Sequence, residues 1–268
     1  MKTACIQLSN TSDISVNLAH AVDLIREARK AGAECIATPE NTLIMTSNTK
    51  ALFANIRAEA ETEAVQMFGA LAQELGIYLL VGSMAIRLAN GKAANRSFLY
   101  SPDGAIAGRY DKIHLFDVDI NESETWRESA NYQAGTTPAL APVGDFCLGL
   151  SICYDLRFAA LYKYYAKAGA NILSVPAAFT AITGKAHWRT LLRARAIETS
   201  SYVIAPAQGG IHEDDRATWG HSMIINPWGE VIAELDHNRP GFCIADLSLE
   251  AVLRERARIP AWNQDTPI

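Results

Sequence analysis

The chain has 268 residues, which suffices for one large domain or two small ones with a substantial core. Its formal charge of −5 and the lack of any Lys/Arg run argue against nucleic acid or an anionic membrane as the main partner. No apolar run approaches the roughly 20 residues that span a bilayer, and the N-terminus turns polar too early for a signal peptide. Five scattered cysteines indicate neither a disulfide framework nor a zinc site. We therefore expect a cytoplasmic protein without a metal.

Apolar strand-like runs alternate with helical patterns in the first half of the chain, which predicts an α/β fold. Residues 111–144 show little periodicity, and a loop of that length in a compact domain is usually functional. The turn sequence at 102–104 predicts a hairpin. The expected elements of this half are strand 3–8, helix 17–31, strand 35–38, helix 59–75, strand 77–82 and the hairpin strands 97–101 and 106–110.

The second half centres on an apolar run, 146–152, that reads as a buried strand and ends at Cys153. A thiol between a strand and a helix can feel the positive helix N-terminus, which lowers its pKa and favours the thiolate. The alternative is a buried cysteine that acts as a small hydrophobe. The elements expected after it are helix 160–168, strand 171–175, helix 187–199, strand 202–207, a hairpin of 223–227 with 231–235, and strand 241–246.

Residues 30–40 and 167–177 are similar to each other. Each reads as a helix end, a glycine stop, a short buried strand and a proline. A fold built from two related α-β halves would explain the similarity, although connections of this kind often look alike. If the halves are related, Glu40 is equivalent to Ala177, and only the first half carries an acid there. That difference points to a chemical role for Glu40.

Glu40, Lys112 and Cys153 each follow a predicted strand, the usual place for chemistry on an α/β sheet. Their order and local sequence resemble the nitrilase superfamily of carbon–nitrogen hydrolases, whose catalytic set is Glu, Lys and Cys. The similarity is closest to the branch of deaminated-glutathione amidases and ω-amidases. It covers nearly the whole chain and implies a single domain, 1–268, folded as a four-layer α-β-β-α sandwich. The matching motifs are 38–40, 110–117, 153–158, 183–188, 193–199, 219–222 and 227–230.

The resemblance implies that Cys153 attacks an amide carbon and forms a thioester. Lys112 and the backbone N–H of Tyr154 would stabilise the oxyanion. Glu40 would take the thiol proton, deliver it to the leaving group and activate water. A carboxylate that does all this should titrate near neutral pH, which burial would achieve. Glu128 matches a second family glutamate that orients the lysine and the substrate; the alternative is a solvated loop acid.

Arg157 is a candidate for binding a substrate carboxylate. If a helix begins just after Cys153, Arg157 lies four residues on and faces the same cleft, where its guanidinium can hold a carboxylate by two hydrogen bonds. The alternative is an ion pair with Asp155 or a loop acid. The loop at Phe179 and Thr180 is the next place to seek such a group.

Two departures from the family pattern bear on specificity. Ala159 and Ala160 stand where the branch often has Pro-Glu, which puts loop geometry and substrate fit in question. Lys185 stands where the branch commonly has proline, in a loop that borders the cleft in relatives.

We expect a cofactor-independent amidase that cleaves a small linear, carboxylate-bearing amide to acid and ammonia or amine. The alternatives are an ω-amidase for α-keto acid monoamides, another aliphatic or carbamoyl amidase, or a catalytically silent binding protein on the same scaffold. The flanking Tyr154 and Asp155 argue against a nitrilase proper. The expected partners are the amide substrate and, since helix 187–199 resembles a segment of family dimer interfaces, a second copy in a homodimer or larger homo-oligomer.

Overall fold

The computed structural model describes residues 1–121 and 124–264. Its strands form two large sheets and two short hairpins. The strands of the first sheet are β1 (Lys2–Gln7), β2 (Cys35–Ala37), β3 (Tyr78–Arg87), β4 (Ala93–Tyr100), β5 (Ile106–Asp111) and β16 (Gly241–Asp246). Those of the second are β8 (Ala139–Val143), β9 (Phe146–Leu150), β10 (Ile172–Ser174), β11 (Tyr202–Ala205), β14 (Met223–Ile225) and β15 (Val231–Glu234). The hairpins are β6 (Asp117–Asn121) with β7 (Glu124–Arg127), and β12 (Gly209–Ile211) with β13 (Ala217–Trp219).

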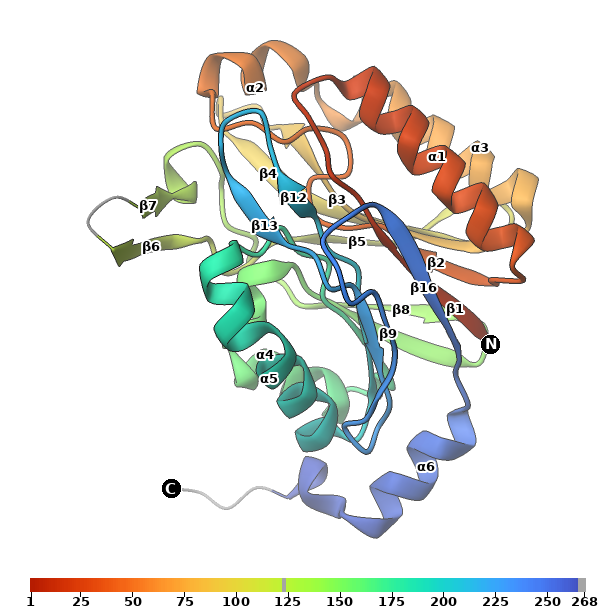
Figure 1. Cartoon of the computed structure of the whole chain (residues 1–268). Helices are drawn as coiled ribbons and strands as arrows, with labels where there is room; N and C mark the ends of the chain where they lie inside the picture. The colour runs from red at the N-terminus through yellow and green to blue at the C-terminus, as the bar shows by residue number, and fades with distance from the viewer. Residues whose placement is uncertain (122–123, 265–268) are drawn as a thin grey trace.

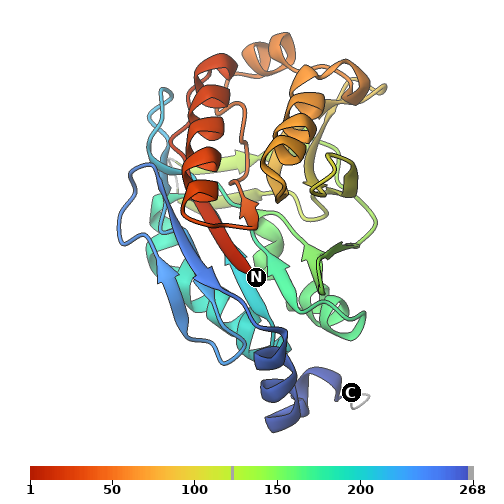
Figure 2. The ribbon, with the colours of Figure 1, turned by 90° about the vertical axis from the view of Figure 1, so that its right-hand side faces the viewer.

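Helices cover the outer faces of the two stacked sheets. The helices are α1 (Ile14–Lys30), α2 (Thr49–Asn55), α3 (Glu63–Leu75), α4 (Ala159–Lys167), α5 (Ala181–Thr199) and α6 (Leu249–Arg258). Helices α1 and α3 lie over the first sheet, of order β16-β1-β2-β3-β4-β5, and α4 and α5 over the second, of order β15-β14-β11-β10-β9-β8 (Figure 1). Figure 2 shows α1 and α3 side by side on their face of the sandwich. The predicted four-layer α-β-β-α sandwich is confirmed.

Strand alternation explains why the first sheet has two apolar faces. In β1, Ala4 and Ile6 pack into a core with α1 and α3, while Cys5 points into the core shared with the second sheet. In β2, Ile36 faces the helices and Cys35 the second sheet. Successive side chains of a strand point to opposite faces, so a strand buried on both faces reads as a continuous apolar run. The sheets therefore stack through side chains that the sequence shows as unbroken apolar segments.

The two similar segments of the sequence take equivalent places in the two sheets. β2 pairs in parallel with β1 and β3, and β10 pairs in parallel with β9 and β11. Gly32 and Gly169, which end the preceding helices, have φ values of +96° and +101°, a conformation that glycine adopts without steric cost. The ends of the two segments meet at Gly82, where a Cβ would lie 2.0 Å from the Thr38 carbonyl oxygen and 2.6 Å from Pro176 Cβ. A side chain at position 82 would separate these ends.

Several elements were not predicted. Residues 111–144 contain the β6–β7 hairpin and the edge strand β8, and the short helix α2 and the C-terminal helix α6 also lie outside the predicted set. Helix α5 begins at Ala181, six positions before the predicted start at 187. The Thr180 side chain caps it by accepting from the Thr183 N–H. None of the helices within the described ranges has the length and apolarity needed to cross a membrane.

Candidate active site

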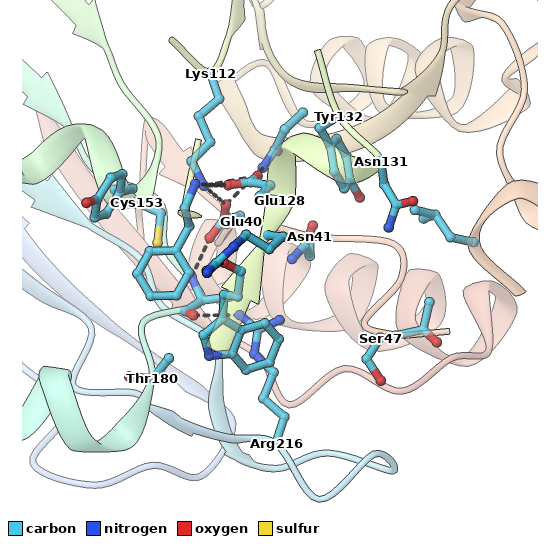
Figure 3. A pocket seen from close by; sticks show the side chains of 18 of the residues that line it. Glu40, Asn41, Ser47, Lys112, Glu128, Asn131, Tyr132, Cys153, Thr180 and Arg216 are labelled. Atoms are coloured by element: carbon cyan, nitrogen blue, oxygen red, sulfur yellow. Dashed lines mark hydrogen bonds and ion pairs between the residues drawn. The ribbon is translucent and has the colours of Figure 1, made fainter. Parts of the chain in front are cut away.

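The ends of three strands from the two sheets converge on one cavity. Glu40 lies three residues after β2, Lys112 directly after β5 and Cys153 three residues after β9. Their exposures are 3%, 2% and 7%. All three line a cavity of about 330 Å³, as does Glu128 (Figure 3). The structure thus brings the predicted set together from positions far apart in the chain.

Three donors hold the Glu40 carboxylate. Its Oε1 accepts from Lys112 Nζ at 2.9 Å and from Asn95 Nδ2 at 2.9 Å, and its Oε2 accepts from the Ala178 N–H at 2.8 Å. Burial by itself would raise the pKa of Glu40, but the Lys112 charge and the hydrogen bonds outweigh it and lower the pKa below its ordinary value. The prediction that burial brings Glu40 to titrate near neutral pH is therefore wrong. Glu40 is ionised at neutral pH and can accept a proton.

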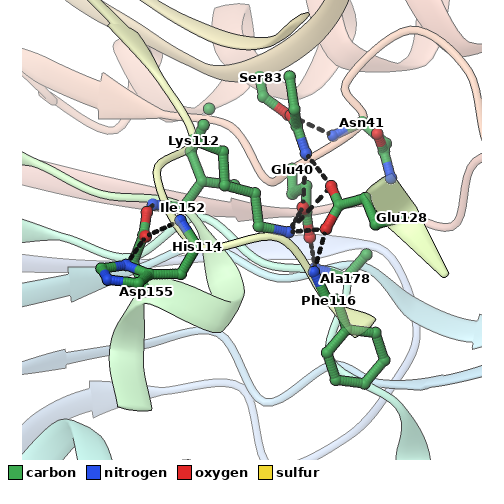
Figure 4. Close-up of polar contacts among 12 residues, drawn as sticks. Glu40, Asn41, Ser83, Lys112, His114, Phe116, Glu128, Ile152, Asp155 and Ala178 are labelled. Carbon is green, nitrogen blue, oxygen red and sulfur yellow. Dashed lines mark hydrogen bonds and ion pairs between the residues drawn. The ribbon is translucent and has the colours of Figure 1, made fainter. Parts of the chain in front are cut away.

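Lys112 lies between two carboxylates. Its Nζ donates to Glu40 Oε1 and to Glu128 Oε2, both at 2.9 Å. Burial opposes the charged form, but the two carboxylates raise the pKa of Lys112 well above its ordinary value, so the ammonium persists. Glu128 also accepts from the Phe116 N–H at 2.7 Å (Figure 4). Glu128 is thus a partly buried partner of the lysine, which excludes the solvated loop acid.

Cys153 begins a 3₁₀ turn, η3 (Cys153–Arg157), and α4 starts only at Ala159. The helix predicted at 160–168 is confirmed, but it does not begin just after Cys153 as the Arg157 argument supposed, and the lowered thiol pKa is wrong. Burial, reinforced by the nearby Glu40 carboxylate, raises the pKa of Cys153 well above its ordinary value in spite of Lys112. The resting group is therefore a protonated thiol, and Glu40 lines the same cavity. Cys153 has a φ of +50°, a strained conformation of the kind that clusters at functional sites.

A buried aspartate fixes the turn that carries the thiol. Asp155, with no exposed surface, accepts from the Ile152 N–H at 2.8 Å and the Tyr110 hydroxyl at 2.7 Å. It also accepts from the His114 N–H at 3.0 Å, and His114 Nδ1 lies 2.7 Å from the same oxygen (Figure 4). Because Tyr110 and His114 flank Lys112 in the chain, this network ties the lysine segment to the cysteine turn.

The predicted substrate-binding residues divide into two groups. Tyr154, Phe179 and Thr180 line the cavity, and the Tyr154 N–H belongs to the first turn of η3, where N–H groups lack partners within the turn. Arg157 is outside the lining set. Its guanidinium lies over the Tyr154 and Phe179 rings, 5.8 and 5.3 Å from their centroids, and Nη1 is 3.3 Å from His187 Nδ1.

The alternative ion pair of Arg157 with Asp155 is wrong, because that carboxylate is engaged by Tyr110 and His114. A role for Arg157 in carboxylate binding stays a prediction. The residues of the two departures from the family pattern, Ala159 with Ala160 and Lys185, are exposed and do not line the cavity. Their effect on specificity also stays a prediction.

Asn95 and Arg216 are among the polar residues of the cavity that sequence reasoning missed. Asn95, in β4, donates through Nδ2 to both Glu40 and Glu128, at 2.9 and 3.1 Å. The available signal was an amide side chain inside a run that otherwise reads as a buried strand. Arg216 comes from the turn between β12 and β13, and nothing in its local sequence indicated the cavity. Within the described residues no cluster of three or more His, Cys, Asp or Glu could hold a metal; independence from cofactors and metals stays a prediction.

A thiol, a carboxylate and an ammonium in one cavity are the groups that amide cleavage by a thiol nucleophile requires. Together the sandwich and this site define an amide hydrolase. The chain belongs to the carbon–nitrogen hydrolase family, whose model matches residues 2–256. As a member of that family it acts on carbon–nitrogen bonds other than peptide bonds.

Curated relatives resemble this chain over most of its length. It is 41% identical to a deaminated glutathione amidase of Synechocystis over 96% of this chain and 95% of the relative. It is 35% identical to an omega-amidase of Bos taurus over 98% and 94%. Among solved structures, the C. elegans NitFhit protein superposes with a TM-score of 0.90 at 34% identity. That match covers 98% of this chain but 64% of the NitFhit chain.

Proposed function

We propose that the protein hydrolyses a small linear amide that bears a carboxylate, releasing the acid and ammonia or an amine, through a thioester on Cys153. The observation that carries this proposal is the Glu40 carboxylate, which pairs with the Lys112 ammonium in the cavity that the Cys153 thiol also lines. The names of the relatives, deaminated glutathione amidase and omega-amidase, support a substrate of this class.

In the first half-reaction Glu40 removes the thiol proton as the sulfur attacks the amide carbon. The amide oxygen becomes an oxyanion beside the Lys112 ammonium and the Tyr154 N–H, and preorganised donors of this kind stabilise the transition state. The tetrahedral intermediate collapses when Glu40 returns its proton to the departing nitrogen. The C–N bond breaks, the thioester remains on Cys153, and Glu40 is again a carboxylate.

In the second half-reaction Glu40 takes a proton from water, whose oxygen attacks the thioester carbon. The C–S bond breaks, the acid leaves and the thiolate recovers its proton from Glu40. Glu128 keeps Lys112 in place through both halves, since it is the second carboxylate that pairs with the ammonium. Burial of all three side chains keeps bulk water from competing with these contacts.

The experiment is a panel of amides assayed for ammonia and amine release, with intact-mass analysis of rapidly quenched reactions. We expect a mass increase equal to the acyl group in wild type and none in Cys153→Ala. Glu40→Gln should block turnover, because the amide side chain can neither accept the thiol proton nor activate water. Glu61→Gln, an exposed glutamate, is the matched control. Turnover by Glu40→Gln near the wild-type rate would transfer the base role to Glu128.

The second candidate is an ω-amidase for α-keto acid monoamides, which the bovine relative favours. The same panel separates the two, since a monoamide of an α-keto acid releases ammonia whereas a peptide-like secondary amide releases an amine. A protein that turns over no member of the panel and forms no adduct would instead be the silent binding protein.

We also infer a homodimer or larger homo-oligomer located in the cytoplasm. Ile182 and Ile197 on α5 support the assembly, because they are 57% and 52% exposed on the helix that resembles a family interface segment. All five cysteines are free thiols, which agrees with a reducing compartment.

A further inference from the structure

The cavity wall contains three cationic side chains within the described residues: Lys112, Arg127 and Arg216. Two of them are already neutralised. Lys112 lies between its two carboxylates, and Arg127 pairs with Asp119 at 2.7 Å. Arg216 forms no ion pair with any described carboxylate, and the substrate of the proposed function carries a negative charge. The unpaired Arg216 guanidinium is therefore the group of this wall that is available to bind an anionic ligand.

Arg216 is held in one orientation by neutral groups. Its Nη2 donates to the Ala178 carbonyl oxygen at 3.1 Å, and its guanidinium carbon lies 4.7 Å from the centroid of the Trp126 ring (Figure 3). A guanidinium stacked on an indole face keeps its N–H edges available in the plane. The backbone of Arg216 is anchored as well, since its N–H donates to Asp214, whose other oxygen accepts from the Ser47 N–H.

The donors of Arg216 are incompletely used. Nε is buried without a hydrogen-bond partner, and Nη1 donates to no described residue. Native structures rarely leave a charged donor in this state. A carboxylate matches the planar guanidinium by two parallel hydrogen bonds, whereas a neutral amide can accept only weaker ones. An anionic ligand in the cavity would thus complete a site that the protein leaves open.

The position of Arg216 couples this contact to the reacting centre. Ala178, whose carbonyl oxygen accepts from Arg216, donates its own N–H to Glu40 Oε2 at 2.8 Å. Ala178 therefore links the Arg216 guanidinium to the Glu40 carboxylate through one hydrogen bond to each. A small linear substrate can then place its amide at Cys153 and a terminal carboxylate at Arg216 within the same cavity.

We propose that Arg216 binds the carboxylate of the substrate and makes the enzyme selective for anionic amides. This inference rests on the proposed function and identifies the residue that reads the charge. Selectivity for charged over neutral amides would then depend on the β12–β13 hairpin, which is far in sequence from Glu40, Lys112 and Cys153.

The test compares kcat/KM for succinamate, a monoamide with a free carboxylate, with that for succinamide, its neutral diamide. In Arg216→Gln we expect kcat/KM for succinamate to fall about 10- to 100-fold, as for loss of a hydrogen-bonded charge pair, and that for succinamide to fall by a smaller factor. The matched control is Arg127→Gln, which removes the same charge from the same wall but from an arginine already paired with Asp119. Its selectivity should stay close to wild type.

Arg216→Lys keeps the charge without the planar fork, so KM for succinamate should rise while kcat changes less. It also provides the readout if Arg216→Gln does not fold. Equal losses on the two amides in either Arg216 variant would overturn the proposal, because Arg216 would then act only through Ala178 and Glu40. The same loss of selectivity in Arg127→Gln, or a loss in Arg157→Gln alone, would also overturn it. A wild-type protein that cleaved neither these nor any other amide would contradict the proposed function instead.

Discussion

At the scale of single residues, the site is one coupled set of charges rather than three independent groups. The Lys112 ammonium is shared by the carboxylates of Glu40 and Glu128. The Cys153 thiol interacts with the Glu40 carboxylate. Lys112 lowers the pKa of Glu40, and the Glu40 carboxylate raises the pKa of Cys153. The site therefore holds an ionised carboxylate and a protonated thiol, and under the proposed mechanism the thiolate forms only as substrate reacts.

The first prediction concerns the nucleophile. Cys153→Ala should abolish turnover and leave the fold intact, because the side chain lines a cavity and loses only a sulfur. Iodoacetamide should label Cys153 ahead of Cys5 and Cys35, since those two are enclosed in the core and burial raises the pKa of Cys35 to about 12. Peptide mapping of partially alkylated protein measures the order. Substantial activity with Cys153 fully alkylated would refute the assignment.

The second prediction concerns the shared cation. Lys112→Met leaves two neighbouring carboxylates without a counter-charge, so the pKa of Glu40 should rise while its burial persists. We expect kcat/KM to fall by about 10²–10³-fold from lost oxyanion support, and the acid limb of its pH profile to move to higher pH. Unfolding in urea at neutral pH should show a loss of about 3–5 kcal/mol, as for a broken buried pair. Lys50→Met, at an exposed position, is the control.

The Glu40–Lys112 ion pair sets the direction in which the unfolding free energy changes with pH. Because the folded pKa of Glu40 is lowered, its contribution is present at neutral pH and is lost as the pH falls through that folded value. The folded pKa of Lys112 is raised, so its contribution is lost only as the pH rises through it, above the ordinary lysine range. Lys112→Met should therefore reduce the dependence of the unfolding free energy on acid. An acid dependence equal to that of wild type would contradict this account.

At the scale of elements, the short turn η3 decides how the thiol is presented. Sequence reasoning placed the next helix at 160–168, and it did not predict the 3₁₀ turn that comes first, held by the buried Asp155. Because Asp155 also accepts from Tyr110 and His114, the turn is fastened to the segment that carries Lys112. The relative position of nucleophile and ammonium thus depends on one carboxylate.

The third prediction tests that fastening. Asp155→Asn replaces an acceptor by a donor facing other donors, so unfolding in urea should show a loss of about 3 kcal/mol. Displacement of Cys153 relative to Lys112 should also lower kcat by about 10- to 100-fold, with KM changed less. Asp145→Asn, in the exposed turn before β9, is the matched control. A variant that loses stability but keeps the wild-type kcat would show that the network supports only the fold.

At the scale of the whole molecule, stacking the two sheets lets one half supply groups to the other. Glu40 follows a strand of the first sheet, while the Ala178 N–H that fixes it follows a strand of the second. At this junction the first half provides the acid and the second a backbone donor. Gly82 permits the approach, since the carbonyl of Thr38 occupies the place where a Cβ would lie.

The fourth prediction concerns assembly. If α5 lies in an interface between copies, light scattering should give at least twice the chain mass of 29.2 kDa. Ile197→Asp should shift the protein towards monomer, because a carboxylate would enter an apolar contact. Ile211→Asp provides the comparison, since Ile211 is 74% exposed on the distant β12 strand. A wild-type mass of one chain, or equal effects of both substitutions, would argue against an α5 interface.

Local patterns in the sequence were enough to predict the class of fold and the three main candidate catalytic groups. Apolar runs and glycine stops are local signals, so most strands and helices could be placed within a few residues. Glu40, Lys112 and Cys153 were identified because each follows a strand inside a recognisable motif, and the structure brings them together. The family assignment from those motifs is confirmed by the match over residues 2–256.

The pKa of Glu40 and the remaining residues of the cavity wall depend on contacts that form only in the folded structure. The pKa of Glu40 depends on Lys112, which lies 72 positions away in the chain, and burial alone gave the wrong direction. Arg216 and Asn95 reach the cavity from a hairpin and a strand that no motif marked. Charge–charge interactions and hydrogen bonds act over distances in space, and those distances exist only after the two sheets have stacked.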